Sequence, residues 1–106
     1  QRFTPNGECI ETLGGIGNHI DGSPDRSYFV GDRAYPGYPA DIFLYRRGET
    51  TPIATFGGQN FQNCTWKLQI HPNPTFSRDG KRIYFNHPDS ENRTEACFVE
   101  IDDLLK

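Results

Sequence analysis

The sequence predicts an all-β fold made of antiparallel β-propeller blades. Aromatic residues make up 13% of the chain, and 11 glycines and 8 prolines interrupt it at short intervals. Short aromatic strands separated by turns explain this composition better than helices do. A repeat of several short strands, described below, indicates propeller blades in particular. The 106 residues are enough for one small domain.

Sheet-favouring runs bounded by turn residues define the expected strands. These runs cover residues 8–13, 26–32, 41–46, 51–56, 81–85 and 95–101, and a further alternating run begins at 66. The run at 51–56 is expected at a sheet edge, because Pro52 has no N–H to donate. The last residues, 102–106, are expected to form one helical turn or to fray.

The stretch 68–85 predicts a hairpin that opens with a polar face. On a strand, Gln69, His71 and Asn73 would share one face, because side chains alternate with period two. Pro72 and Pro74 cannot donate ladder hydrogen bonds, so this strand end is expected at an edge or an opening. Three hydrogen-bonding or ligating groups on one face suggest a metal site.

The second half of this hairpin begins after a tight turn. Ser77-Arg78-Asp79-Gly80-Lys81 contains Gly80, which can adopt a positive φ. The preceding repeat unit carries a similar turn: Ser23-Pro24-Asp25 matches Ser77-Arg78-Asp79 at an offset of 54 residues. Since Asp25 and Asp79 occupy the same repeat position, we expect both to cap backbone amides and not to act as catalytic acids.

The repeat continues beyond the turn. At the same offset, 41–45 matches 95–99. Tyr28-Phe29 matches Tyr84-Phe85 with a slip, which we ascribe to an extra Gly80 in the second copy. Under this interpretation, residues 1–16 hold the outer strand of a preceding blade, 17–57 form one blade, and 64–102 form a last blade that lacks its outer strand.

Two blades cannot close a ring, since propellers have about 4 to 8. The chain starts at Gln1 and contains no methionine. We therefore expect it to be the C-terminal part of a larger propeller. The alternative is a subunit whose ring is closed by other copies or by a partner.

Charge and hydropathy exclude some partners. The net charge is −3, from 11 basic and 14 acidic residues that are fairly mixed along the chain. This leaves no basic surface for nucleic acid. No apolar run approaches a membrane span, and no signal peptide is visible. We expect neither nucleic acid nor a membrane as partner, and a cytoplasmic or periplasmic location if the source is bacterial. The isolated Cys9, Cys64 and Cys97 predict no disulfide framework.

The hairpin from His71 to Phe85 resembles the HPxFSPDGKxIxF hairpin of TolB-like and WD-type propellers. Together with Asn18-His19, Val30-Gly31-Asp32 and Ile42-Phe43-Leu44-Tyr45, it makes residues 8–102 similar to the C-terminal part of oligogalacturonate lyases. The resemblance implies a seven-bladed propeller that cleaves pectin-derived oligogalacturonate by β-elimination, with a manganese ion in its central funnel.

The resemblance also implies which residues bind the metal. His19 and His71 match two metal histidines of the family. In the family's Gln-x-x-His-Pro-His-Pro run, Asn73 replaces the second histidine, and Gln69 lies one residue from the position of the glutamine. We therefore expect a metal site of His19, His71, Asn73 and Gln69. The family's base and arginine lie upstream, so no catalytic residue is expected here and the segment alone should be inactive.

This chemistry is consistent with the residue types. Elimination at a uronate needs a base for the C5 proton and a cation to neutralise the carboxylate. Neutral imidazoles and carboxamide oxygens suit a divalent ion such as manganese. The alternatives are structural histidines at strand starts and a non-catalytic TolB-like propeller segment that binds a protein or glycan. A serine peptidase propeller is a third possibility, for which the chain offers no Gly-x-Ser-x-Gly. Two alternatives remain for a group of four residues: they lie in a solvated loop, or they line a sugar site. These residues are Asp32, Arg33, Tyr35 and Tyr38.

Overall fold

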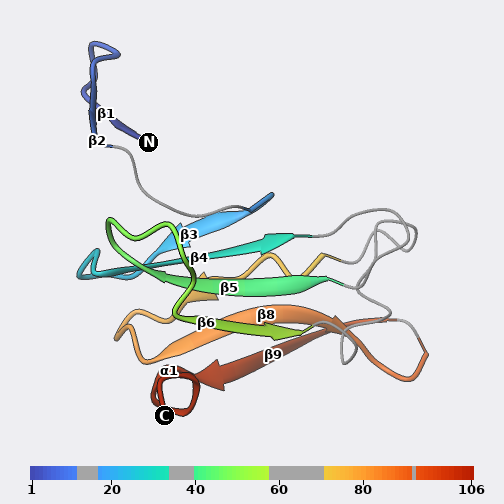
Figure 1. Cartoon of the computed structure of the whole chain (residues 1–106). Helices are drawn as coiled ribbons and strands as arrows, with labels where there is room; N and C mark the ends of the chain where they lie inside the picture. Colours follow the sequence, from blue (N-terminus) through green and yellow to red (C-terminus); the bar gives the residue numbers. More distant parts are fainter. Residues whose placement is uncertain (12–16, 34–39, 58–70, 92) are drawn as a thin grey trace.

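A computed structural model describes residues 1–11, 17–33, 40–57, 71–91 and 93–106. In this part of the chain the fold consists of three antiparallel sheets and one short helix (Figure 1). The all-β prediction is confirmed, and none of the described sheets closes on itself. No helix in the described ranges has both the length and the apolar character needed to cross a membrane.

The first sheet is a small hairpin near the N-terminus (Figure 1). In it, β1 (Arg2–Phe3) pairs with β2 (Cys9–Glu11). The single strand expected over 8–13 is thus represented by β2, whereas β1 was not expected. Its turn contains Gly7 at a φ of 85°, a conformation that glycine adopts without strain.

The second sheet has four strands in the order β3-β4-β5-β6. These are β3 (Ile20–Gly22), β4 (Tyr28–Arg33), β5 (Asp41–Arg46) and β6 (Ala54–Gly57). The bounds of β5 match the prediction. Four consecutive residues of β5 are buried, and because side chains alternate between the two faces of a strand, both faces of β5 are covered there. The sheet edge expected next to Pro52 is formed by β6.

The third sheet has three strands in the order β7-β8-β9. These are β7 (Thr75–Phe76), β8 (Arg82–Pro88) and β9 (Thr94–Glu100), and α1 (Ile101–Leu104) follows directly. The predicted hairpin is present as β7-β8, and β7 lies at the sheet edge as the prolines indicated. The helical turn expected at the C-terminus is α1.

Apolar side chains from the four-stranded and three-stranded sheets pack into one core. The buried members of this core are Val30, Ala40, Ile42, Leu44, Ile83 and Ile101. The rings of Phe56 and Phe85 meet across the two sheets, with centroids 5.6 Å apart. Full burial of one such aliphatic side chain contributes about 1.5–3 kcal/mol, so this shared core holds the two sheets together.

The predicted turn role of Asp25 is confirmed. Its Oδ1 atom accepts hydrogen bonds from the hydroxyls of Ser23 and Ser27, both at 2.7 Å, and from the backbone N–H of Ser27 at 3.0 Å. The N–H of Tyr28 donates to Ser23 Oγ at 3.0 Å. These bonds lower the pKa of Asp25 to about 2, chiefly through the Ser27 hydroxyl.

The second turn repeats this network. Ser77 Oγ donates to Asp79 Oδ1 at 2.7 Å, the N–H of Lys81 donates to the same oxygen at 3.0 Å, and the N–H of Arg82 donates to Ser77 Oγ at 3.0 Å. The hydroxyl of Ser77 is also the main reason why the pKa of Asp79 is lowered. The turn role of Asp79 is therefore confirmed too.

The expectation that Gly80 is an extra residue is wrong. Arg26 occupies the equivalent position and has a φ of 63°, close to the 73° of Gly80. The shared hydrogen bonds keep the same offset through Tyr28 and Arg82. The two turns therefore have equal length. Each contains one residue in the left-handed conformation, Arg26 in the first turn and Gly80 in the second.

The expectation that His71 and Asn73 share a strand face is also wrong. Residues 71–74 form no strand, and β7 begins at Thr75. Asn73 adopts a φ of 47°, and the prolines on either side of it have no N–H for a ladder. Gln69 and Cys64 lie outside the described residues. Cys9 and Cys97 are free thiols.

Candidate functional site

The candidate site lies where the four-stranded sheet meets the segment that leads into β7. His19 precedes β3, and His71 precedes β7. The two imidazole rings lie with their centroids 5.6 Å apart and their planes at 72°. The structure thus brings together the two predicted metal histidines, which are distant in the sequence.

Asp32 is the buried centre of this site. Its side chain is completely inaccessible to solvent. Oδ1 accepts a hydrogen bond from the backbone N–H of His19 at 3.0 Å, and Oδ2 accepts one from the backbone N–H of Asn73 at 2.8 Å. Buried carboxylates need such partners, because desolvation without them is costly. Asp32 therefore joins β4 to both predicted ligand segments.

Asp32 also orients the ring of His19. The Nδ1 atom of His19 lies 3.1 Å from Oδ2 and 3.2 Å from Oδ1 of Asp32. A carboxylate in this position favours a proton on Nδ1 and leaves Nε2 available to bind an ion or a proton. The His19 side chain is 41% exposed, so a ligand can reach it.

The chain just before His19 lies against β4. A Cβ atom at Gly17 would come within 3.1 Å of the Asp32 carbonyl oxygen and of Gly31 Cα. The N–H of Asn18 donates to the Asp32 carbonyl at 2.8 Å, and the N–H of Asp32 donates to the His19 carbonyl at 3.2 Å. This close approach fixes the backbone of His19 against β4 and so sets the position from which its side chain extends.

Asn73 is held by its backbone, whereas its side chain is exposed. Its left-handed conformation is one that asparagine, aspartate and histidine adopt more readily than other residues with a side chain. The histidine that the resemblance implies at this position would thus fit the same backbone. Asn73 can offer a carboxamide oxygen, a weaker metal ligand than imidazole.

A second pair of bonds ties the same two sheets together beside the site. The Oδ2 atom of Asp21, in β3, accepts hydrogen bonds from the Thr75 hydroxyl at 2.9 Å and from the Phe76 backbone N–H at 2.7 Å. Segment 73–76 is therefore attached to the four-stranded sheet at two points, one through Asp21 and one through Asp32.

The described residues supply only some of the donors that a metal site would need. Among the residues that the structure describes, no group of three or more His, Cys, Asp and Glu side chains is arranged to hold a metal ion. His19 and His71 provide two imidazoles, while both oxygens of Asp32 are engaged in hydrogen bonds. A complete site needs further donors, for which the sequence offers Asn73 and the undescribed Gln69.

Of the residues in the candidate site, Asp32 was predicted least well from the sequence, as a loop residue or part of a sugar site. Its position at the end of an apolar strand, two residues after the buried Val30, was the available signal. Alternation places Asp32 and Val30 on the same face of the strand, which points the carboxylate inward.

No protein-family model matches this chain, and no curated protein or solved structure matches it either. Functional hypotheses for it therefore depend on its own residues and on the resemblance of its motifs.

Proposed function

We propose that this chain is part of an oligogalacturonate lyase-like β-propeller, in which it contributes ligands to a divalent metal site. The observation that carries the proposal is the approach of His19 to His71, with ring centroids 5.6 Å apart. The four-stranded and three-stranded antiparallel sheets support blades at 17–57 and 64–102, the second without an outer strand.

In this proposal His19 and His71 bind the metal, and Asp32 keeps the His19 ring in its binding orientation. Asn73 and Gln69 are the candidates for oxygen ligands. A bound divalent ion such as manganese would neutralise the uronate carboxylate and stabilise the charge that forms when C5 loses its proton. The base is expected in upstream parts of the propeller. Only the complete protein would therefore act on oligogalacturonate or a related uronate.

The test is metal analysis of the complete protein, combined with the ultraviolet absorbance of the unsaturated elimination product. Wild-type protein should contain divalent metal and should convert oligogalacturonate. His71→Ala should lower metal affinity by about tenfold or more, by analogy with the loss of supporting residues at metal sites. His87→Ala is the matched control, because His87 lies in β8 opposite Glu95 and outside the site. Unchanged metal content in His71→Ala would contradict the assignment.

The second candidate is a non-catalytic TolB-like propeller segment that binds a protein or a glycan. It is favoured by the lack of a third His, Cys, Asp or Glu ligand among the described residues. In that case the edge-to-face contact of His19 with His71 is structural, and Asp32 serves only to join the sheets. Wild-type protein with neither metal nor lyase activity would favour this second function.

A further inference from the structure

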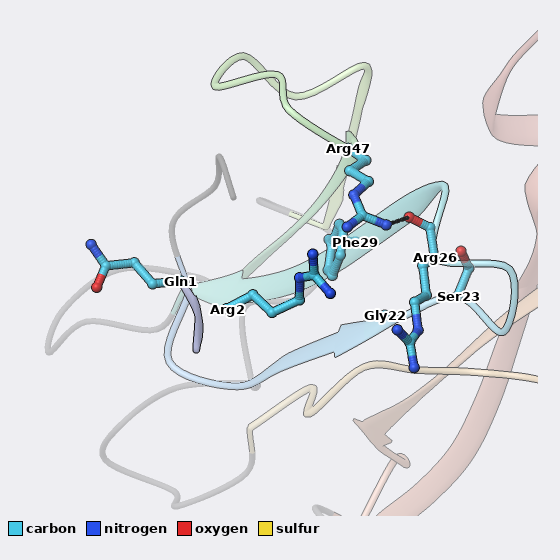
Figure 2. A pocket seen from close by; sticks show the side chains of 7 residues that line it. All are labelled: Gln1, Arg2, Gly22, Ser23, Arg26, Phe29 and Arg47. Carbon is cyan, nitrogen blue, oxygen red and sulfur yellow. Dashed lines mark hydrogen bonds between the residues drawn. The ribbon is translucent and has the colours of Figure 1, made fainter. Parts of the chain in front are cut away.

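A cavity of about 380 Å³ lies between the N-terminal segment and the turn that connects β3 to β4. Its walls are formed by Gln1, Arg2, Gly22, Ser23, Arg26, Phe29 and Arg47 (Figure 2). Three of these seven residues are arginines, and none is acidic. The cavity therefore has a cationic lining in a chain whose net charge is −3.

Two carboxylates lie beside the cavity: Glu11 pairs with two of its arginines, and Asp25 accepts a hydrogen bond from the lining residue Ser23. Glu11 accepts hydrogen bonds from Arg2 Nε at 3.2 Å and from Arg47 Nε at 2.8 Å, and it also pairs with Arg47 Nη2. The Arg47 hydrogen bond lowers the pKa of Glu11, and Glu11 raises the pKa of Arg47, so both groups stay charged at neutral pH. Arg26 forms no ion pair within the described part of the chain. Glu11 thus pairs with two of the three guanidinium groups, those of Arg2 and Arg47.

Glu11 also limits the freedom of the arginines it contacts. Arg47 is further fixed by a 3.5 Å hydrogen bond from Nη1 to the carbonyl of Arg26. Arg2 and Arg47 line the cavity together with Phe29 (Figure 2). A guanidinium has five N–H donors in a planar fork, so Glu11 cannot satisfy all the donors of both arginines. The remaining ones are available to a ligand.

Phe29 gives the cavity one apolar wall. Its ring lies against Gly22, where a Cβ atom would come within 3.2 Å of it. Gly22 and Phe29 are opposite each other at the turn end of the β3-β4 pair, whereas His19 and Asp32 lie at its open end. The cavity and the candidate metal site share no residue.

We propose that this cavity binds an oxyanion, a phosphate or carboxylate group, through Arg2, Arg26 and Arg47. Guanidinium forks match the geometry of these groups and bind them through charge-assisted hydrogen bonds. The ring of Phe29 suits a ligand in which the oxyanion is attached to a compact sugar-sized body. This binding site is separate from the proposed metal site and does not depend on lyase activity.

The test is calorimetric titration of the full chain with inorganic phosphate, glucose 6-phosphate and glucuronate, with glucose as the neutral probe. Binding of any of the three anions, without binding of glucose, is expected. Tighter binding of glucose 6-phosphate than of phosphate would identify a sugar phosphate as the ligand class, and a preference for glucuronate would identify a carboxylate. Equal binding of phosphate and glucose 6-phosphate would identify free phosphate.

Variants locate the site. Arg26→Gln should weaken anion binding about tenfold, the loss expected for one charge-assisted hydrogen bond. Arg46→Gln is the matched control, since the neighbouring Arg46 pairs with Glu49 and does not line the cavity. Arg26→Lys keeps the charge without the fork and should give an intermediate loss. The proposal fails if none of the anions binds, or if Arg46→Gln weakens binding as much as Arg26→Gln. Circular dichroism of each variant confirms that it is folded.

Discussion

The backbone N–H of Asn73 donates a 2.8 Å hydrogen bond to the Oδ2 atom of Asp32, which lies 41 residues earlier in the chain. The acceptor is completely buried, and its other oxygen accepts the N–H of His19. One carboxylate therefore fixes both segments that carry the predicted metal ligands.

Asp32→Asn should lower the free energy of unfolding by about 2 kcal/mol, since a carboxamide nitrogen would face buried N–H donors that a carboxylate satisfies. Urea denaturation measures this change. Asp102→Asn is the control, because Asp102 is exposed on α1. An effect of Asp32→Asn as small as that of the control would show that the buried carboxylate does not stabilise the junction.

The two turn aspartates should make stability depend on acidic pH. The pKa of Asp25 is lowered from 3.8 to about 2 in the folded chain. A carboxyl with a lower pKa in the folded state stabilises the fold above its unfolded pKa, and the effect is lost as pH falls through the folded value. Stability should therefore fall as pH is lowered from about 4 towards 2.

Ser27→Ala tests the cause of this shift. It removes the hydroxyl that contributes most to the lowered pKa of Asp25, so the Asp25 pKa should rise towards 3.8. Asp79 is an internal control, since its pKa is lowered by Ser77 in the other turn. Carboxyl chemical shifts followed by NMR across this pH range report both groups. If Asp25 in the wild type titrates near 3.8, the interpretation of the turn is wrong.

Arg26 and Gly80 allow a reciprocal test of backbone strain. Both residues adopt the left-handed backbone conformation, and they occupy equivalent turn positions. Arg26→Gly should raise the free energy of unfolding by about 1 kcal/mol, because a residue with a Cβ pays for this conformation and glycine does not.

Gly80→Ala should lower the free energy of unfolding by a similar amount. Its new Cβ would meet Pro24 Cδ at 3.5 Å, an ordinary contact, so the loss would come from the backbone alone. Chemical denaturation of the two variants gives both values. Changes of the same sign in the two variants would argue against equivalent turns.

The parts of the fold that depend on neighbouring residues could be predicted from the sequence. The bounds of β5 and the Ser-x-Asp turns follow from local pattern, since the turn bonds span two to five residues. The short strands β1 and β3 escaped prediction, because two or three residues carry too little pattern to indicate a strand.

The candidate site was only partly predictable for a similar reason. The histidines were found through the resemblance of the motifs around them. The role of Asp32 depends on partners 13 and 41 residues away, and no local spacing signals such contacts. The prediction of a strand through Asn73 was wrong. The hydrogen bond to Asp32 and the flanking prolines favour a left-handed turn over the hydrogen-bond ladder of a strand.

Two of the hydrogen bonds at the junction between the two larger sheets have a main-chain donor. Asp32 accepts from the N–H of Asn73, and Asp21 accepts from the N–H of Phe76. A residue other than proline that tolerates the local backbone keeps these bonds. Mutation can therefore exchange the exposed side chain at position 73, and with it the chemistry offered to a ligand, while the sheets stay joined.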